Sequence, residues 1–462
     1  MNNKHGLLLP EVQMNFLKDK IFLKSMLSIA VPIALQNLIT SSLNMVDTLM
    51  ISSLGQASIA AVGLANQLFF FYILITFGIN SGSSIFIAQY WGKEDIPSIR
   101  KVLGLALSIS TIVGIFFTIV AFFFPKFIMS IFIKEPEVIK LGSDYLKIVS
   151  LSYIVTAISF AYSVALRTTG RPNVPMKISA IAFVTNTVVN YILIFGKFGF
   201  PAMGVKGAAW GTVIARGTEI CFMLYTVYST KGVLAASLKE LLTWSKEFVS
   251  KYLKTTYPVI LAEGFWSLGQ VMYSIAYARI GEESTAAVQI TNTIQNIFFV
   301  VVRGLANACT VMVGNKIGGG DETEAYEYAK KFMIISTLIG LTLGIILATT
   351  TKFTLMLFKG LDPSLYEVSR KLLVVMGLTF VIRVFNTTAI VGVLRGGGDT
   401  KFAMVLDIWT VWIVGVPLAF IGALVLRLPV HYVFVIVTLE EVFKVVVTIP
   451  RIISKKWIRN IT

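Results

Sequence analysis

The stretch Val31–Leu54, VPIALQNLITSSLNMVDTLMISSL, is an apolar run of membrane-spanning length with Pro32 near its start and one carboxylate, Asp47, near its end. Reading 226 residues further along gives Tyr257–Ile280, YPVILAEGFWSLGQVMYSIAYARI, in which Pro258 stands at the position of Pro32. The register continues without a gap through the following apolar run. The chain is therefore a tandem duplication.

The two copies share a scaffold and differ in their polar residues. With the same offset, Glu263 of the second copy falls on Asn37 of the first, and Asp47 of the first falls on Tyr273 of the second. Each copy therefore carries one acid in its first apolar run, but at a different depth. The duplication predicts similar packing in the two halves and different chemistry.

The composition identifies an integral membrane protein. Hydrophobic residues make up 56% of the chain and charged residues 14%, against about 25% charged in soluble domains. The cysteines, Cys221 and Cys309, both lie in apolar runs, and the only histidines are His5 and His431. These residues form no disulfide framework and no metal-ligand cluster, so we expect no cofactor beyond a coupling ion.

Twelve apolar runs are long enough to cross a bilayer as helices, six in each copy. The predicted fold is an all-α integral membrane protein with twelve transmembrane helices in two pseudo-symmetric six-helix lobes. Because six is even, the copies have the same orientation and are related by an axis along the membrane normal. The predicted spans are residues 27–53, 59–90, 102–133, 141–166, 175–197, 207–229, 255–280, 285–316, 328–357, 366–394, 402–426 and 431–453.

The positive residues give the orientation. On this topology 24 Lys and Arg residues lie on the side that holds both termini, and 11 lie on the opposite side. Basic loops face the cytoplasm, so we expect a multi-pass protein of the cell membrane with both termini cytoplasmic. The net charge of +16 is then a topology signal with some attraction to anionic membrane lipids, and not a sign of nucleic-acid binding.

Five segments are predicted. Residues 1–25 form a cytoplasmic amphipathic segment, and residues 26–229 form the N-terminal six-helix lobe. Residues 230–254 place Leu, Trp and Phe at helical spacing with lysines opposite, which predicts an amphipathic linker on the inner leaflet. Residues 255–453 form the C-terminal lobe, and residues 454–462 are a basic cytoplasmic tail.

Charged residues inside predicted spans are functional candidates, because each costs about 3 kcal/mol near the bilayer centre even on the insertion scale. Glu263 lies near the middle of its span, close to Pro258, which can bend the helix. The alternative role for Glu263 is a structural ion pair with Arg303 or Arg383. For Asp47, nearer its helix end, the alternative is stabilisation of a local turn or interface.

The remaining intramembrane charges have a simpler explanation. Glu219, Glu440, Glu441 and Lys444 lie near predicted helix ends, where ion pairing or a side chain that reaches the interface is expected. Asp407, a third of the way along the eleventh span, has no assigned role.

Asn186 and Asn190 lie four residues apart in the fifth span and share a helix face. Their carbonyl oxygens can complete a hard-cation site around a carboxylate. The alternative is that the pair joins two helices in the membrane through hydrogen bonds.

Several motifs resemble the multidrug and toxin extrusion (MATE) transporters. They are PIALQNL and NMVDT in the first span, LRTTG after the fourth, N-x3-N followed by YILIFGKFGFPAMGVKGAAWGT, and LRGGGDT before the eleventh. The resemblance covers the chain from about Ser25 to Trp457. It implies a V-shaped pair of six-helix lobes that exports organic cations in exchange for sodium ions or protons.

In the N-terminal lobe the resemblance places the family's cation-binding acid on Asp47. Supporting positions fall on Asn186, Asn190 and Thr212, and the bending proline falls on Pro32. A Na⁺ ion is thus expected at Asp47, Asn186 and Asn190 if sodium is the coupling ion. Many relatives carry Asp at the position of Asn190, and one carboxylate fewer predicts weaker cation binding.

In the C-terminal lobe Glu263 resembles the span-seven acid of the NorM-type branch, about one turn from its expected place. Arg383 and Asn386 occupy the region of span ten where the branch has another acid. The expected coupling or substrate residues of this lobe are therefore Glu263, Arg303, Arg383 and Asn386.

The first hypothesis is a cation-coupled antiporter that works by alternating access on small organic cations, with no obligate protein partner. The second is a flippase for a lipid-linked or anionic substrate, which Arg303 and Arg383 favour. A membrane-embedded enzyme is the distant third, because the sequence shows no His-rich cluster, no HExxH motif and no intramembrane Ser-Lys or paired-Asp arrangement.

Overall fold

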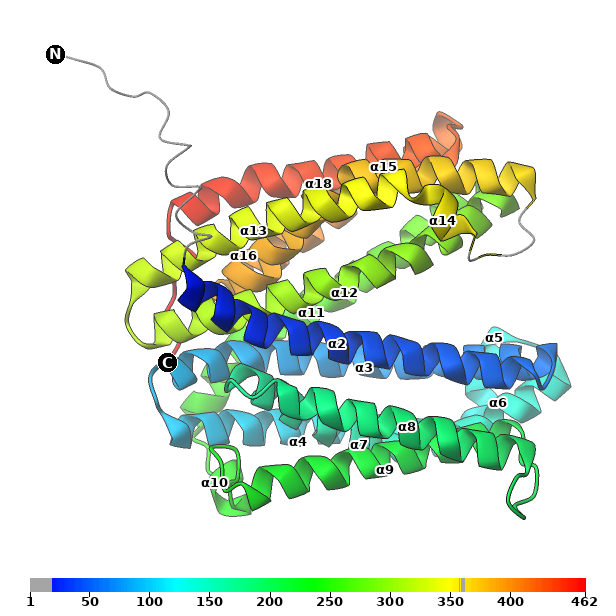
Figure 1. The fold of residues 1–462 in the computed structure, drawn as a ribbon, viewed down its shortest axis with the longest axis horizontal. Helices are drawn as coiled ribbons and strands as arrows, with labels where there is room; N and C mark the ends of the chain where they lie inside the picture. The colour runs from blue at the N-terminus through cyan, green and yellow to red at the C-terminus, as the bar shows by residue number, and fades with distance from the viewer. Residues whose placement is uncertain (1–18, 357, 359–361) are drawn as a thin grey trace.

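A computed structural model describes residues 19–356, 358 and 362–462 of the chain. Within these residues the secondary structure is helical throughout, and the helices run side by side as long rods (Figure 1). The bundle divides into two lobes, one from each copy of the duplicated sequence.

The N-terminal lobe holds eight helices that follow one another along the chain. They are α2 (Lys20–Ser52), α3 (Gln56–Gly92), α4 (Ile96–Phe123), α5 (Pro125–Phe132), α6 (Pro136–Val149), α7 (Leu151–Thr168), α8 (Asn173–Phe195) and α9 (Val205–Ser229). The predicted third span is divided into α4 and α5 at Phe124, whose φ of −118° and ψ of 34° are not helical, because Pro125 disfavours the helical conformation in the residue before it. The fourth predicted span is divided into α6 and α7 at Ser150.

The C-terminal lobe repeats this order. Its helices are α11 (Lys246–Ala278), α12 (Glu282–Gly318), α13 (Glu322–Thr349), α14 (Thr351–Leu355), α15 (Pro363–Thr387), α16 (Thr400–Trp409), α17 (Val416–Phe420) and α18 (Val430–Ile453). Three π-helical segments, Thr388–Arg395, Thr410–Gly415 and Ile421–Val425, interrupt the tenth and eleventh spans. Such segments are rare in proteins overall, and those that occur often lie at functional sites.

Ten helices in the described part of the chain are long and apolar enough to cross a membrane. The other two predicted spans are α9 and α18, with 25 and 24 residues. Both carry charges in their interiors, which lower their hydropathy, yet α9 packs along α8 and α18 packs along α15. They complete six spans in each lobe (Figure 1).

Equivalent helix starts use the same local signal in both lobes. Asp95 Oδ1 accepts the backbone N–H of Ser98 at the start of α4, 3.0 Å away. Asp321, 226 residues later, accepts the N–H of Glu324 at the start of α13, 2.9 Å away. Each carboxylate satisfies a donor that the first helical turn leaves free.

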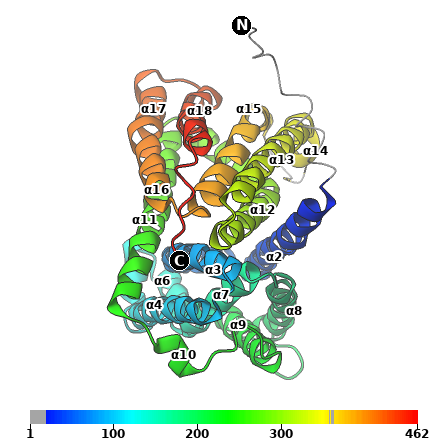
Figure 2. The same cartoon turned by 90° about the vertical axis from the view of Figure 1, so that its left-hand side faces the viewer.

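The lobes touch at the end of the bundle where α2 begins and α18 ends (Figures 1 and 2). There α3 and α12 approach backbone to backbone. A Cβ atom on Gly92 would overlap the carbonyl of Asn315, and one on Gly318 would overlap the carbonyl of Gln89. At the other end each lobe has a hydrophobic core of its own, made only of residues from that lobe. The molecule is therefore V-shaped and open at the end away from the chain termini.

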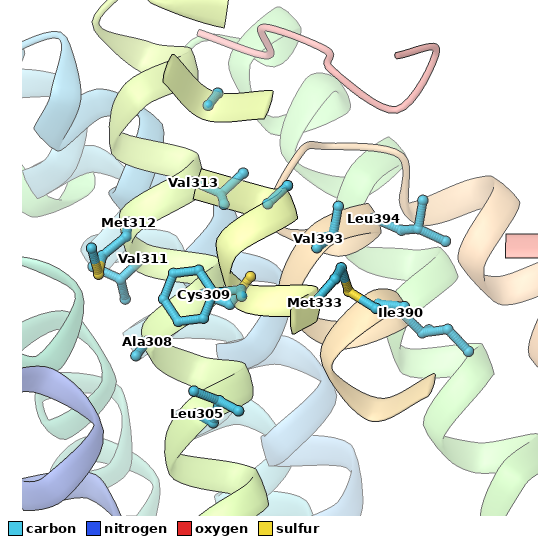
Figure 3. Packing of buried hydrophobic residues seen from close by; sticks show 14 of the residues in the cluster. Leu305, Ala308, Cys309, Val311, Met312, Val313, Met333, Ile390, Val393 and Leu394 are labelled. Carbon is cyan, nitrogen blue, oxygen red and sulfur yellow. The ribbon is translucent and has the colours of Figure 1, made fainter. Parts of the chain in front are cut away.

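The first turns of α2 pack on the C-terminal lobe, although the rest of α2 belongs to the N-terminal lobe. Phe22 is fully buried, with its ring centroid 5.0 Å from that of Tyr328 and 5.2 Å from that of Phe332. These residues join a core built around α12, α13 and the first π-helical segment (Figure 3). Asp19, which caps α2, pairs with Lys331 at 2.6 Å.

The segments outside the lobes differ from the expected amphipathic pieces. Residues 1–18 of the predicted N-terminal segment lie outside the described residues, and Lys20–Ser25 are part of α2. The linker forms one short helix, α10 (Leu238–Leu242), and its Leu234 and Leu241 are buried in the N-terminal lobe. Residues 246–254 begin α11. The linker is thus not a single surface helix, and it packs on the N-terminal lobe through a few buried residues.

Candidate functional site

The predicted polar group of the N-terminal lobe comes together at the end of α2 and the middle of α8. The Nδ2 atom of Asn190 donates to Asp47 Oδ1 at 2.7 Å and to Asn186 Oδ1 at 3.1 Å. Both asparagines are fully buried, while Asp47 is partly buried. The two asparagines, four residues apart, therefore lie on one face of α8, and this face is directed toward α2.

The amide group of Asn190 lies between the two oxygens that would otherwise surround a cation. Its own Oδ1 atom has no hydrogen-bond partner and packs against Gly211 of α9, where a Cβ atom would overlap it. The Nδ2 atom of Asn186 is also without a partner. Asp47 thus accepts a hydrogen bond from a neutral donor, which suits an ionised carboxylate.

A charged pair on α9 that the sequence analysis did not connect with this site lies nearby. Arg216 Nη1 pairs with the buried Glu219 Oε2 at 2.6 Å, three residues along the helix, and Arg216 is near enough to Asp47 for their charges to interact. Thr212 donates to Ala208 of its own helix at 3.1 Å, so its predicted supporting role gains no contact with Asp47. The Arg-x-x-Glu spacing inside span six was the signal for this pair.

The two predicted bending prolines lie inside continuous helices, Pro32 in α2 and Pro258 in α11. Before Pro32 the helix α2 packs on the C-terminal lobe, and four residues after it Gln36 donates to Ser179 of α8 at 2.9 Å. The contacts of α2 with the C-terminal lobe continue past Pro32 to Ile33, so both lobes hold the helix around this proline. Bending at either proline stays a prediction.

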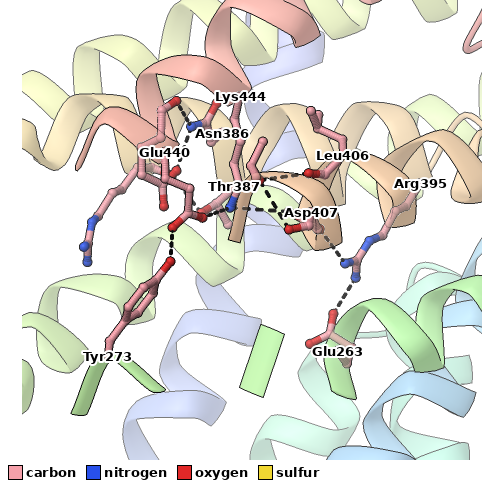
Figure 4. Close-up of polar contacts among 12 residues, drawn as sticks. Glu263, Tyr273, Asn386, Thr387, Arg395, Leu406, Asp407, Glu440 and Lys444 are labelled. Atoms are coloured by element: carbon pink, nitrogen blue, oxygen red, sulfur yellow. Dashed lines mark hydrogen bonds and ion pairs between the residues drawn. The ribbon is translucent and has the colours of Figure 1, made fainter. Parts of the chain in front are cut away.

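The C-terminal lobe contains a buried chain of alternating charges (Figure 4). Arg395 lies 2.5 Å from Glu263 and 3.4 Å from Asp407. Lys444 lies 3.5 Å from Asp407 and 2.7 Å from Glu440. The hydroxyl of Tyr273 on α11 donates to Glu440 Oε2 and ends the chain.

The partner of Glu263 corrects the sequence prediction, which offered Arg303 or Arg383. The partner is Arg395, which the topology had placed among the cytoplasmic loop residues. The π-helical segment Thr388–Arg395 carries this arginine back into the lobe, where it is buried. Arg303 is exposed on α12, close enough to Glu263 for their charges to interact.

The other predicted residues of this lobe contact α18 and not Glu263. Arg383 stacks over the ring of Phe434, 5.0 Å from its centroid. Asn386 donates to the carboxylate of Glu441 at 2.7 Å.

Glu440 and Lys444 of α18 are paired with each other, as expected, but their predicted position near a helix end is wrong. Glu440 and Lys444 are buried in the middle of α18 (Val430–Ile453). Asp407, which had no assigned role, connects this pair to Arg395.

Each acid in this chain already has a cationic side chain beside it. Breaking a buried ion pair by removing one partner is strongly destabilising, because the other charge is left uncompensated. Among the described residues no group of three or more His, Cys, Asp or Glu side chains is arranged to hold a metal ion. The arrangement favours a fixed ionic framework in this lobe.

Comparison with known proteins agrees with the geometry. The family model MatE matches residues 32–192 and 258–421, so each match begins at one of the two equivalent prolines. The chain is 24% identical over 435 residues to a probable multidrug resistance protein NorM of Thermotoga maritima, covering 94% of this chain and 93% of that one. It is 24% identical over 405 residues to the multidrug resistance protein PmpM of Pseudomonas aeruginosa, covering 87% and 84%.

Solved structures show the same fold. A MOP superfamily transporter from Pyrococcus furiosus, described as having a binding pocket of reversed polarity that suggests a different function, matches with a TM-score of 0.85. That match has 20% identity and covers 94% of this chain and 96% of the other. An outward-facing conformation of a multidrug resistance MATE transporter matches with a TM-score of 0.84, 20% identity and the same coverage. The relatives carry the names of transporters and not of enzymes, and the chain belongs to the MatE family of multidrug efflux transporters.

Proposed function

We propose that the protein is a secondary active antiporter that exports small organic cations across the cell membrane, and that Asp47 binds the coupling ion. The observation that carries this proposal is the contrast between the two acids. Asp47 is hydrogen-bonded to the neutral amide of Asn190 at 2.7 Å, whereas Glu263 lies 2.5 Å from the guanidinium of Arg395. Only the first acid is free of a directly bound cationic side chain.

The ionic framework of the C-terminal lobe argues against a second coupling ion there. A cation that bound Glu263 or Glu440 would have to displace Arg395 or Lys444, both of which are buried. The displaced charge would then lack a partner in a medium of low dielectric, which is costly. Coupling through the N-terminal lobe alone avoids this penalty.

The arrangement around Asp47 favours a proton over sodium. Sodium is a hard cation and takes oxygen ligands, but the group between Asp47 and Asn186 is the NH₂ of Asn190. To offer oxygen, the Asn190 amide would have to turn its Oδ1 away from Gly211 and break both hydrogen bonds. A proton needs only one carboxylate oxygen.

Proton binding can bias the conformational equilibrium because it changes the contacts between α2 and α8. A protonated Asp47 is a weaker acceptor for Asn190, and α2 contacts both lobes. A ligand shifts a two-state equilibrium only through its different affinity for the two states. Loss of this hydrogen bond supplies such a difference.

The test is ethidium transport by the purified protein in liposomes, with a pH gradient imposed without sodium and a sodium gradient imposed at clamped pH. We expect the pH gradient alone to drive transport, and Asp47→Asn to abolish it. The matched control is Asp144→Asn, which removes an acid that pairs with Lys206 at a partly exposed site, 3.2 Å away. Glu263→Gln should lower the amount of folded protein, while the folded fraction keeps pH-driven transport.

Two results would contradict the proposal. Wild-type transport rates in Asp47→Asn would exclude Asp47 as the coupling residue. Transport driven by sodium alone would show that Asp47, Asn186 and Asn190 bind sodium despite the intervening amide.

The alternative is a flippase for an anionic or lipid-linked substrate, and the exposed Arg303 on α12 is the observation that favours it. Two results together would support the flippase. Neither gradient would drive ethidium transport, and the protein would move a fluorescent anionic lipid between the leaflets. Arg303→Gln would abolish this lipid movement. Ethidium transport that is unchanged in Arg303→Gln would exclude a role for this arginine in the antiporter.

A further inference from the structure

The last residues of the chain are anchored on the C-terminal lobe by a tryptophan. Trp457, which follows α18, is fully buried, and its indole Nε1 donates to the carbonyl of Ile452 at 3.0 Å. Its ring lies over Gly397, where a Cβ atom would overlap it. The segment predicted as a basic cytoplasmic tail is therefore packed against the protein at this point.

An ion cluster extends this anchor. The buried carboxylate of Asp399 lies 2.7 Å from Arg451 Nη2 and 3.1 Å from Arg459 Nη2. The backbone N–H of Arg459 also donates to the carbonyl of Gly397 at 2.8 Å. Two arginines that converge on one carboxylate set the position of residue 459 relative to the C-terminal lobe.

The same short segment is bound on its other side by the N-terminal lobe. Gln89 of α3 is fully buried; its Nε2 donates to the carbonyl of Arg459 at 3.1 Å, and its Oε1 accepts the N–H of Ile461 at 2.8 Å. One side-chain amide thus pairs with a backbone acceptor and a backbone donor two residues apart. Ile461 packs against the core of the N-terminal lobe.

The segment crosses the place where the two lobes meet. Gly318 of α12 lies against the backbone of Gln89, so the residue that binds the tail also forms the closest approach of α3 and α12. Asn460 donates to the carbonyl of Ile317 in α12 at 3.4 Å. The tail therefore joins the lobes at the end of the molecule where they already touch, which is the end where α2 begins (Figure 1).

We propose that residues 457–462 form a strap that holds the lobes together at this end and must release Gln89 before the lobes separate there. This inference rests on the proposed alternating-access mechanism. The docked strap favours the conformation that is open away from the chain termini. Because two hydrogen bonds to a buried amide are lost on release, we expect the strap to shift the equilibrium between the two conformations about tenfold.

The test measures the distance between the lobes and not transport. Spin labels are placed on Lys239→Cys in α10 and Thr323→Cys in α13, both exposed, in the full chain with the exposed Cys221 replaced by Ser. Double electron–electron resonance spectroscopy in liposomes then gives the ratio of long to short distances between the two spin labels. We expect this ratio to rise about tenfold when residues 459–462 are deleted and similarly in Gln89→Ala.

A double-mutant comparison separates the strap from general loosening. If the deletion and Gln89→Ala act through the same contact, their combination raises the ratio no further than either change alone. Lys456→Ala is the matched control, because it removes an exposed tail charge that does not touch Gln89. Gel filtration of each variant shows that the labelled protein is folded.

The wild-type protein distinguishes the possible failures. Two distances in the wild type with an unchanged ratio in both the deletion and Gln89→Ala would overturn the strap. A single distance in the wild type at every pH and substrate concentration would show that the lobes do not rock, and alternating access would fall together with the strap.

Discussion

The two lobes come from one duplication and have different chemistry at equivalent positions. With the offset of 228 residues that relates the turns after the fourth and tenth spans, Arg167 is equivalent to Arg395 and Ser179 to Asp407. In the C-terminal lobe Arg395 bridges Glu263 at 2.5 Å and Asp407 at 3.4 Å. This centre is made of ion pairs.

The equivalent centre of the N-terminal lobe is made of hydrogen bonds to hydroxyl groups and contains one charged side chain, Arg167. Asn37 is equivalent to Glu263, and its neighbour Gln36 donates to Ser179 at 2.9 Å and to Ser163 at 3.4 Å. Arg167 donates to the same Ser163 at 3.0 Å. The equivalent residues therefore form hydrogen bonds to hydroxyl groups in one lobe and ion pairs in the other.

This difference suits the two lobes to different roles. Charges locked in pairs resist both protonation and separation, so the C-terminal lobe is suited to act as a rigid body. Of the two first-span acids, Asp47, whose equivalent is Tyr273, is the one that accepts its hydrogen bond from a neutral donor. The duplication has kept one packing scheme and given the first-span acids different partners.

Exchange of the two equivalent arginines for methionine tests the comparison with the largest expected effect. Arg395→Met leaves Glu263 and Asp407 without a counter-charge and should lower the free energy of unfolding by about 3–5 kcal/mol. Arg167→Met removes a hydrogen bond from a guanidinium to the hydroxyl of Ser163 and should lower the free energy of unfolding by about 1.5–3 kcal/mol. Denaturant unfolding of both variants in the same detergent measures the difference, and equal losses would refute the distinction between the lobes.

The glycines beside the two polar centres give a smaller effect that separates stability from coupling. A Cβ atom on Gly211 would overlap Asn190 Oδ1, and one on Gly415 would overlap the hydroxyl of Tyr273. Each alanine variant should lose about 1–3 kcal/mol of stability through overpacking. Only Gly211→Ala should also slow pH-driven ethidium transport by the folded protein, because it displaces the residue that binds Asp47.

Gly217→Ala is the control on the same helix, since no atom lies within 4 Å of a Cβ there. It should unfold and transport like the wild type. Loss of coupling in Gly415→Ala but not in Gly211→Ala would place the coupling site in the C-terminal lobe.

The smallest effect concerns the tie between α2 and the C-terminal lobe. The pKa of Asp19 is lowered by its hydrogen bonds with Lys331 and with the N–H of Phe22. A lowered pKa means that this contribution is present above the unfolded-state value of 3.8 and is lost as the pH falls through the lower folded-state value. Asp19→Asn should therefore lower the free energy of unfolding by less than about 1 kcal/mol at pH 7, and this loss should shrink below about pH 4. Thermal unfolding across pH 3 to 7 measures it, and a loss that grows on acidification would contradict the assignment.

Local patterns predicted much of this molecule. Apolar runs predicted all twelve spans, and Asp95 and Asp321 marked equivalent helix starts, because both signals depend only on neighbouring residues. Asn186 and Asn190 were placed on one face by their spacing, and the resemblance to the family supplied Asp47 as their partner. The charges of α18 were misplaced because ion pairs inside the lobe, and not closeness to a helix end, compensate them.

The sequence alone determined the duplication, the membrane class, the family, and the acid that each copy carries in its first span. Only the tertiary structure decided that Glu263 binds Arg395, 132 residues away, and that the tail returns to Gln89 in the other lobe. Helix formation and membrane insertion follow from hydrogen bonds and hydropathy within a short stretch. The partner of a buried charge depends on which helix faces are packed together, and that is a property of the whole bundle.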